Sequence, residues 1–329
     1  MDKPCVLVTG GAGFIGSHVC KALSRANIIP VTMDNLVTGH RFAVKWGPFV
    51  EGDVSDQTLV EYVIRNNNVT AVMHFAALSD VGLSNLKPDL YYHNNIGGML
   101  SLMEACKNTG VKKFIFSSSC AVYGMPETVP ISEDFPQAPI NPYGWTKLIC
   151  EKMLKSYART NDINAVILRY FNACGADPEG ELGEFHEPEN HLIPNAIMAA
   201  MGEREYLEVY GNDYETPDGT CIRDYIHVHD LALAHIKAYD HLVSGGKGID
   251  LNVGSGVGYS VLEIIDAIED ALGRKTPHEF KQRREGDTPV LCAEISKSRK
   301  ILEFQASMSD LSTIVNTAAK GLRLKSQLV

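Results

Sequence analysis

A glycine cluster directly after the first apolar run constrains this chain more than any other feature. Residues 6–9 lead into the G-x-G-x-x-G spacing of Gly11, Gly13 and Gly16, and an amphipathic helical pattern follows. In this pattern the first glycine permits a tight turn, the second lets backbone approach an anion, and the third brings the helix against the strand. The N–H groups at the helix start then face the anion. The context therefore predicts a strand–turn–helix unit that holds a dinucleotide pyrophosphate.

A carboxylate at the end of the second apolar run predicts which dinucleotide is bound. The run 28–33 ends in Asp34, at the distance of about 20 residues that separates the glycines from the ribose ligand in such folds. A carboxylate there accepts hydrogen bonds from the adenosine ribose hydroxyls and repels a 2′-phosphate. We therefore expect NAD rather than NADP.

Strand-like and helical patterns alternate through the first half of the chain, which is typical of a parallel sheet with helices on both faces. The expected fold is α/β, a Rossmann-type doubly wound parallel sheet with a smaller C-terminal α/β substrate domain. The pair Gly97-Gly98 suggests close packing within the third helix. The expected strands are 5–9, 28–34, 69–76, 111–117 and 165–171, and the expected helices are 15–26, 57–66, 91–108 and 143–160.

The composition changes after Asn172, where we place a domain boundary. Residues 175–190 contain five glutamates, two prolines and three glycines, which predicts an exposed connection. Residues 1–173 form the expected NAD-binding domain, with a returning segment near 221–255. Residues 174–220 and 256–329 form the expected substrate domain. Ser260 and Glu263 have the spacing of a capping box and predict a helix start.

Overall composition is that of an ordinary globular enzyme, with 45% hydrophobic and 21% charged residues. A formal net charge of −10 disfavours a nucleic-acid partner. No apolar run reaches the roughly 18 residues of a membrane span, and the first residues lead directly into the first strand, leaving no room for a signal peptide. The eight cysteines are scattered without a C-x-x-C pair, so we expect reduced thiols in a cytoplasmic protein.

A tyrosine and a lysine four residues apart predict a catalytic base. Tyr143 and Lys147 lie at the start of an expected helix, where this spacing places both side chains on one face. An ammonium about 5 Å from a phenol lowers the phenol pKa by roughly two units at an effective dielectric near 20. Ser117 to Ser119 follow an expected strand, whose C-terminal end should line the same crevice.

Five motifs together give the chain a family resemblance: Thr9–Gly16 (TGGAGFIG), His74–Ala77 (HFAA), Phe116–Gly124 (FSSSCAVYG), Tyr143-x-x-x-Lys147 and Arg169–Asn172 (RYFN). They resemble the extended short-chain dehydrogenase/reductase superfamily. Further segments, Gly211–Tyr214, Asp218–Thr220, Arg223–Val228 and Arg283–Asp287, make it most similar to the UDP-glucose 4-epimerase family. The motifs span residues 6 to 294.

The resemblance implies roles by position. Tyr143 would be the base for the sugar 4-hydroxyl, Lys147 its electrostatic partner and a ribose ligand, and Ser119 a hydrogen-bonding aide. The implied substrate residues include Arg223 and Arg284 as a clamp on the diphosphate of a UDP-sugar. The implied cofactor positions are Gly10, Gly11, Gly13, Phe14, Ile15, Gly16, Asp34, Asn35, Asp53, Val54, Phe75, Ala76, Ala77, Asn94, Ser117, Tyr143, Lys147 and Phe171. The substrate positions are Ser119, Tyr143, Asn172, His191, Leu192, Tyr210, Arg223, Arg284, Asp287 and Leu291.

The implied reaction is epimerisation at C4 of a UDP-hexose, interconverting UDP-galactose and UDP-glucose through a 4-keto intermediate with transient hydride transfer to NAD. Two positions depart from the family pattern. Ser79 stands where a lysine is usual, which leaves more to Lys147 or points, with Asp80, to altered cofactor handling. Leu291 replaces a bulkier aromatic that limits the sugar C2 substituent, which predicts partial acceptance of N-acetylated sugars.

Several alternatives stay open at this point. A UDP-N-acetylglucosamine or UDP-pentose 4-epimerase or a UDP-sugar decarboxylase would share the glycines and the Tyr143–Lys147 pair. A 4,6-dehydratase is less favoured because Cys120 and Ala121 supply no acid–base pair. An ordinary dehydrogenase would exchange its NAD at each turnover, and a non-enzymatic NAD sensor would usually lack the base. No metal site is expected, since His227 and His229 suggest structural roles, and a homodimer through helices 91–108 and 143–160 is possible.

Overall fold

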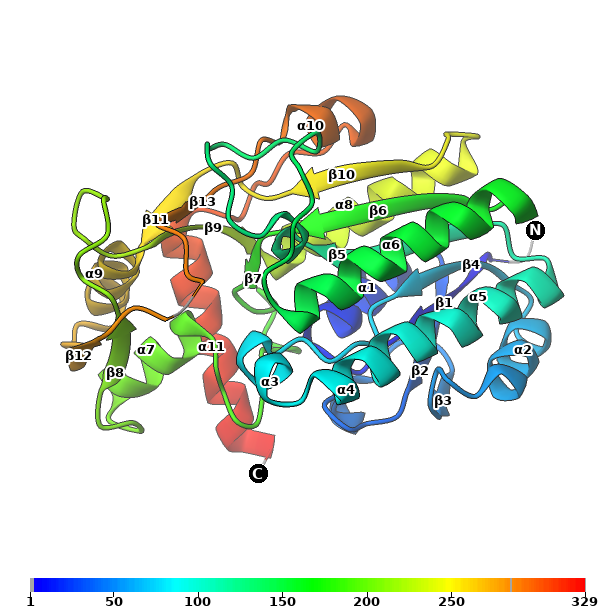
Figure 1. The fold of residues 1–329 in the computed structure, drawn as a ribbon. Helices are drawn as coiled ribbons and strands as arrows, with labels where there is room; N and C mark the ends of the chain where they lie inside the picture. The colour runs from blue at the N-terminus through cyan, green and yellow to red at the C-terminus, as the bar shows by residue number, and fades with distance from the viewer. Residues whose placement is uncertain (1–2, 285, 329) are drawn as a thin grey trace.

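A seven-stranded parallel sheet, built mostly from the first half of the chain, forms the larger part of the protein, whose computed structural model describes residues 3–284 and 286–328. The strand order is β10-β6-β5-β4-β1-β2-β3 (Figure 1). Its strands are β1 (Cys5–Thr9), β2 (Ile29–Asp34), β3 (Phe49–Glu51), β4 (Val69–His74), β5 (Lys113–Ser119), β6 (Asn164–Tyr170) and β10 (Ile249–Val253). The chain reverses its direction of travel across the sheet between β1 and β4, which is where doubly wound sheets bind ligands.

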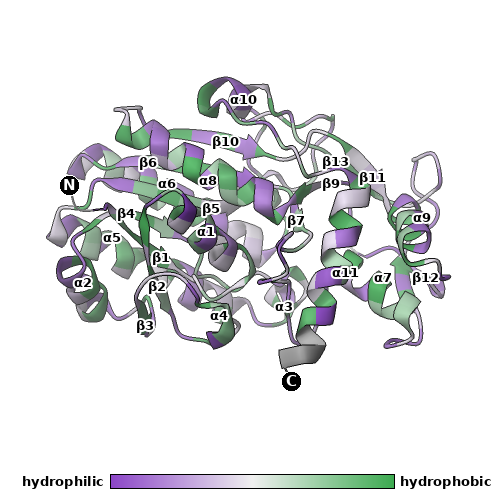
Figure 2. Cartoon of the chain, turned by 180° about the vertical axis from the view of Figure 1, so that it is seen from behind, coloured by the Kyte–Doolittle hydropathy of each residue, from purple (hydrophilic) through white to green (hydrophobic). Residues whose placement is uncertain are grey.

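Helices cover both faces of this sheet and bury two apolar cores. Helices α1 (Phe14–Arg25) and α8 (Val228–Val243) pack against each other and contribute to one core, around Val8, Val19 and Leu231. Helices α2 (Gln57–Asn66), α5 (Gly97–Thr109) and α6 (Pro142–Asn161) contribute to the other. Burial on both faces explains why the strands are apolar runs rather than alternating patterns, as the green of β1 shows (Figure 2).

The second half forms a smaller unit beside the sheet (Figure 1). Strand β9 (Ile222–His227) pairs with β7 (Asn172–Cys174), β11 (Gly258–Ser260) and β13 (Val290–Leu291), and β8 (Leu207–Tyr210) pairs with β12 (His278–Lys281). Helices α7 (Leu192–Met201), α9 (Val261–Leu272) and α11 (Leu311–Leu328) enclose a third core. Helix α10 (Ser296–Leu302) instead packs on α8 and β10, so a late part of the chain returns to the first unit.

The expected elements are confirmed in type, with shifted ends. Strand 5–9, helix 57–66 and the Ser260–Glu263 capping box appear as expected. Strand β3 was not expected, because three partly exposed residues carry too little pattern. The helix expected over 91–108 is divided into α4 (Pro88–Tyr91), a π-helical turn (Tyr92–Ile96) and α5.

The connection over residues 175–190 is not the exposed segment that its composition predicted. Asp177, Leu182 and Phe185 are buried. Lys21 of α1 forms ion pairs with Asp177, Glu179 and Glu181 and so offsets part of the charge of the acidic run, and Phe185 packs on Phe42 with ring centroids 5.3 Å apart. Charge was therefore a poor guide to exposure, because the compensating lysine lies far away in the sequence. The proposed domain boundary near residue 174 falls just before this segment.

Three further elements complete the description. Helix α3 (Val81–Leu86) begins at Asp80, whose side chain accepts a hydrogen bond from Leu83 N. Single turns of 3₁₀-helix span Arg41–Ala43 and Cys120–Tyr123. Among the residues that the structure describes, no helix combines the length and apolarity needed to cross a membrane.

Candidate active site

The glycine turn lies between β1 and α1 and is shaped by close backbone contacts. Gly10 has a φ of +72°, and a Cβ there would lie 2.6 Å from Ala76 N. A Cβ on Gly16 would lie 2.2 Å from the carbonyl oxygen of Gly10, so the helix approaches the strand as predicted. The glycine that takes the left-handed turn is Gly10 rather than Gly11, whose Cβ would instead crowd Thr32.

The start of α1 presents backbone N–H groups to this turn. Gly13 is the N-cap residue, and within the described chain no side chain caps this helix. The first N–H groups of a helix without a capping side chain are available to an anion. Together with the glycine contacts, these groups fit the pyrophosphate of a dinucleotide, and Phe14 and Ile15 open the helix beside it.

Asp34 ends β2 and is already held in place by backbone. Its carboxylate accepts hydrogen bonds from Ala12 N at 2.9 Å and Leu36 N at 2.8 Å. Burial raises the pKa of Asp34, and these two hydrogen bonds oppose that rise. Asn35 donates to Asp53, which also accepts from Ser55, so the ends of β2 and β3 are joined near Val54. This fixed carboxylate fits the predicted ribose contact.

The remaining cofactor candidates lie at the same edge of the sheet. Phe75 and Ala76 follow β4 and both donate backbone N–H groups to Thr9 O, and Ala77 comes next. Asn94 lies in the π-helical turn and donates to Asn95, whose side chain reaches Thr146 of α6. Phe171 follows β6. The carboxyl ends of β1, β2, β4, β5 and β6 therefore bring together candidates that are far apart in the sequence.

Ser119, Tyr143 and Lys147 also meet at this edge. Ser119 is the last residue of β5, and Asn141 caps α6, so that Tyr143 and Lys147 occupy its first two turns. Lys147 Nζ lies 5.8 Å from the centroid of the Tyr143 ring and donates a 2.7 Å hydrogen bond to Ser117 O. The predicted pairing of the lysine and the tyrosine on one helical face is present in the structure.

The electrostatics of this trio differ from the sequence-based expectation. Burial raises the pKa of Tyr143 to about 12, and its hydrogen bond with Ser119 offsets only part of that rise. Burial likewise lowers the pKa of Lys147 to about 8, although Cys150 and Glu151 oppose this effect. The lowering of the Tyr143 pKa expected from Lys147 is not seen in the chain by itself, because desolvation of the phenol dominates. A further positive charge is needed to make the phenol a base.

Substrate candidates form three small groups in the second unit. Arg223 and Leu291 are register partners in β9 and β13, and the Arg223 guanidinium lies 3.5 Å from the Asp287 carboxylate. The Arg284 guanidinium stacks 3.8 Å from the centroid of the Tyr210 ring. His191 and Leu192 are the N-cap and first residue of α7.

Asn172 and Asp224 lie beside these groups, and both make hydrogen bonds with the backbone. Asn172 donates to the backbone of Asp224. The carboxylate of Asp224 accepts from Ser255, Gly256 and Ala293, so this buried carboxylate is committed to backbone rather than to Arg223. Leu291 packs beside the apolar cluster that contains Phe171.

A buried polar network behind the trio was missed by sequence reasoning. Arg169, fully buried in β6, donates to both oxygens of Glu151 and to Tyr123, and Ser118 donates to Glu151 at 2.5 Å. Glu151 lies one helical turn after Lys147, so the network fixes α6 against β5. An arginine inside the apolar run 164–170 was the available signal, because a buried guanidinium requires a carboxylate partner.

Comparison with known proteins gives the family. Residues 6–254 match the model of the NAD dependent epimerase/dehydratase family. The chain is 49% identical over 318 residues to a UDP-glucose 4-epimerase of Rhizobium meliloti (strain 1021), covering 97% of each. It also matches the crystal structure of UDP-glucose 4-epimerase from Brucella ovis in complex with NAD, with a TM-score of 0.95, 53% identity, and coverage of 97% and 98% of the two chains.

A second solved structure has both parts of the expected ligand set. The UDP-glucose 4-epimerase from Bifidobacterium longum, in complex with NAD+ and UDP, matches with a TM-score of 0.92 and 40% identity, covering 97% of this chain and 98% of that one. Family model, curated relative and solved structures agree over nearly the whole chain. The chain therefore belongs to the NAD dependent epimerase/dehydratase family and, within it, to the UDP-glucose 4-epimerases of the extended short-chain dehydrogenase/reductase superfamily.

Proposed function

We propose that this chain is an isomerase that interconverts UDP-galactose and UDP-glucose by NAD-dependent epimerisation at C4. The observation that carries the proposal is the meeting of Ser119, Tyr143 and Lys147 with the glycine turn at one edge of the sheet. A dinucleotide on that turn and a sugar beside the phenol would then share a single crevice. The related enzymes of Brucella ovis and Bifidobacterium longum, solved with NAD, support the cofactor.

The chain's own residues supply proton transfer and binding. Tyr143 accepts the proton of the sugar 4-hydroxyl while hydride leaves C4, and it returns the proton when hydride comes back to the opposite face of the 4-ketone. Ser119 holds the hydroxyl, and Lys147 supports the phenolate and binds the ribose. Bound oxidised NAD supplies the hydride acceptor and a positive charge beside the phenol, which is the further charge that the raised pKa of Tyr143 calls for. No net oxidation results.

The cofactor and substrate positions are proposed to work as the resemblance implies. Asp34 holds the adenosine ribose, and the glycine turn holds the pyrophosphate. On the other side Arg223 and Arg284 bind the UDP diphosphate, which Arg223 does by exchanging Asp287 for phosphate oxygens. Tight binding of UDP with few contacts to the hexose leaves the 4-ketone free to turn over.

A cofactor-free assay tests the proposal. Purified protein is incubated with UDP-galactose and no added NAD, and the anomeric signals are followed by NMR. Formation of UDP-glucose would establish both the reaction and retention of NAD through purification. A protein that carries NAD after gel filtration and leaves UDP-galactose unchanged would contradict the proposed reaction while leaving the cofactor site intact.

UDP-N-acetylglucosamine is the second candidate substrate, and Leu291 is the observation that favours it. Its side chain lies beside the Phe171 cluster, where the resemblance places a bulkier residue near sugar C2. Turnover of UDP-N-acetylglucosamine that falls severalfold in Leu291→Tyr, with UDP-galactose turnover retained, would support this role. No turnover by the unaltered protein would exclude it. UDP-pentose substrates are tested in the same assay.

Assembly and location are proposals of the same kind. Helix α5, helix α6 and the turn before α5 expose apolar side chains, among them Tyr92, Leu100 and Trp145, and this supports a homodimer through these helices. The eight cysteines, all within the described residues, have free thiols, which supports a cytoplasmic location. Light scattering with Leu100→Lys tests the first proposal, since a dimer through α5 should dissociate.

A further inference from the structure

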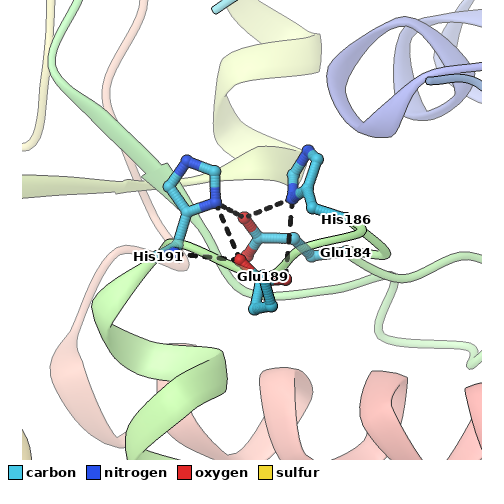
Figure 3. Close-up of side chains that lie close together, drawn as sticks. All are labelled: Glu184, His186, Glu189 and His191. Atoms are coloured by element: carbon cyan, nitrogen blue, oxygen red, sulfur yellow. Dashed lines mark hydrogen bonds and ion pairs between the residues drawn. The ribbon is translucent and has the colours of Figure 1, made fainter. Parts of the chain in front are cut away.

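Two histidines and two glutamates converge in the segment that precedes α7. Glu184, His186, Glu189 and His191 each offer one ligand atom, and these atoms all lie within 4.8 Å of one another. Figure 3 shows both imidazole rings directed at the two carboxylates. We refer to these four residues as the His–Glu cluster. It lies outside the proposed catalytic trio, and the roles proposed above use only His191.

The spacing within the cluster is close to that of metal ligands. His191 Nδ1 lies 2.9 Å from Glu184 Oε1 and 3.1 Å from Glu189 Oε1. His186 Nδ1 lies 3.5 Å from Glu184 Oε1 and 3.6 Å from Glu189 Oε2. Four ligand atoms at about 2.0–2.2 Å from a tetrahedral zinc ion are separated by roughly 3.4 Å. The four nitrogen–oxygen separations lie on either side of that value, and all four ligand atoms lie within 4.8 Å of one another, so the cluster has the dimensions of a zinc site.

Two of the ligand atoms are buried without a hydrogen bond. Within the described chain, Glu184 Oε1 and His186 Nδ1 make no well-aligned hydrogen bond, although Glu184 Oε1 lies 2.9 Å from His191 Nδ1 and 3.5 Å from His186 Nδ1. The Glu184 side chain is only 6% exposed and is directed into the cluster. A buried polar atom without a partner is costly. A cation at the centre would satisfy both atoms at once.

We propose that Glu184, His186, Glu189 and His191 bind one divalent transition-metal ion of the zinc class. Two imidazole nitrogens and two carboxylate oxygens form a four-ligand set that suits zinc, and the imidazoles disfavour magnesium and calcium. The two carboxylates neutralise the ion. The side chain of His191 is 53% exposed and provides a path for its entry.

The ion would act as a clamp on the segment between the two units. His186 packs edge-on against Phe14 at the start of α1, with ring centroids 6.3 Å apart, and Asn190 donates to Asp80 at the start of α3. His191 begins α7. A metal ion that joins Glu184 to His191 would therefore hold the substrate-side helix start at a fixed position relative to the glycine turn.

A second cluster of carboxylates, beside α1, already contains a cation. Asp177, Glu179 and Glu181 surround Lys21 Nζ at 2.8, 2.9 and 2.6 Å, so their cation is already present. In the described residues, these ion pairs of the His–Glu cluster join its own imidazoles to its own carboxylates.

Zinc titration of the full-length, tag-free protein tests the proposal. The protein is treated with EDTA, dialysed and titrated with ZnCl₂ by calorimetry, and thermal unfolding is followed with and without zinc. We expect one ion per chain and a higher Tm with zinc. In His186→Ala the dissociation constant should rise at least tenfold and the Tm increase should disappear. His278→Ala removes an exposed imidazole in β12 and should behave like the unaltered protein.

The outcomes distinguish a metal site from a cluster that is held together only by ion pairs between its imidazoles and its carboxylates. Absence of stoichiometric zinc binding by the unaltered protein would overturn the proposal, as would equal binding by His186→Ala. The titration of the unaltered protein decides the matter even where a variant does not fold, and circular dichroism checks that the variants do. None of these readouts depends on epimerase activity, so the outcome is independent of the proposed function.

Discussion

The cofactor side and the substrate side of the site are built in different ways. On the cofactor side, backbone sets the geometry: the glycine turn fits only without side chains, and two backbone N–H groups hold Asp34. On the substrate side, side chains hold one another: Arg223 forms an ion pair with Asp287, and the Arg284 guanidinium stacks on the Tyr210 ring. The first side is preformed, whereas the second must exchange partners to bind a diphosphate. Changes on the first should therefore affect stability and cofactor retention, and changes on the second should affect substrate affinity.

Tyr143→Phe is expected to have the largest effect, because it removes the proton acceptor where the two sides meet. Loss of a general base lowers kcat by roughly 10²–10⁴-fold. Turnover of UDP-galactose measures the loss, and an unchanged Tm shows that the fold is retained. An unchanged rate would show that the base has been assigned to the wrong residue.

Acid should destabilise the cofactor side strongly through buried histidines. Burial lowers the pKa of His74 to about 3 and the pKa of His18 and His235 to about 4. Their folded pKa values lie below the unfolded value of about 6.5, so the stability is present above pH 6.5 and is lost as the pH falls towards 4. These differences correspond to about 3 kcal/mol each for His18 and His235 and about 5 kcal/mol for His74.

Urea unfolding between pH 7 and pH 4.5 measures this loss. His235→Leu should reduce the slope of unfolding free energy by about 1.4 kcal/mol per pH unit, one proton's worth. The sign is opposite for His191 on the substrate side. The raised pKa of His191 contributes stability below pH 6.5 that is lost as the pH rises towards 10. If the free energy of unfolding depended on pH equally in His235→Leu and in the unaltered protein, His235 would not be buried in its neutral form.

Gly16→Ala tests whether the cofactor side is fixed by backbone contact. The new Cβ would lie 2.2 Å from Gly10 O, so the helix must move away from the strand, at about 1–3 kcal/mol for overpacking. Gly97→Ala is the matched control, since within the described residues no atom beyond its chain neighbours and its own helix backbone lies within 4 Å of its Cβ position. Chemical unfolding and the NAD content after gel filtration are the measurements. If Gly16→Ala and Gly97→Ala had the same stability and the same NAD content, backbone contact would not be what fixes the cofactor side.

Arg284→Met should have the smallest effect and should act on binding alone. Loss of a hydrogen bond to a charged group, worth about 1.5 kcal/mol, raises KM roughly tenfold with kcat retained. Its neighbour Arg283 pairs with Asp213 and stacks on Tyr214, so Arg283→Met is the control and should leave KM nearly unchanged. If Arg283→Met raised KM more than Arg284→Met does, Arg283 rather than Arg284 would be the residue that contacts the diphosphate.

Much of the cofactor side was predictable from local patterns. The glycines, Asp34 and the Tyr143–Lys147 pair each lie at an element boundary that hydrophobic periodicity marks, and a parallel sheet places such boundaries at one edge. The electrostatics were not predictable, because the pKa of Tyr143 depends on how much of the chain excludes water from it. The packed state of residues 175–190 was also missed, since its compensating cation is Lys21.

The sequence by itself determined the fold class, the family and the cofactor, because these depend on short motifs whose spacing survives in one dimension. Only the tertiary structure decided which charges are neutralised and which are left to bind something else. Arg169, Lys21 and the His–Glu cluster all contact partners that are either distant in the sequence or placed by a turn. Electrostatic energies depend on distance and burial, and both of these quantities exist only after the chain has folded.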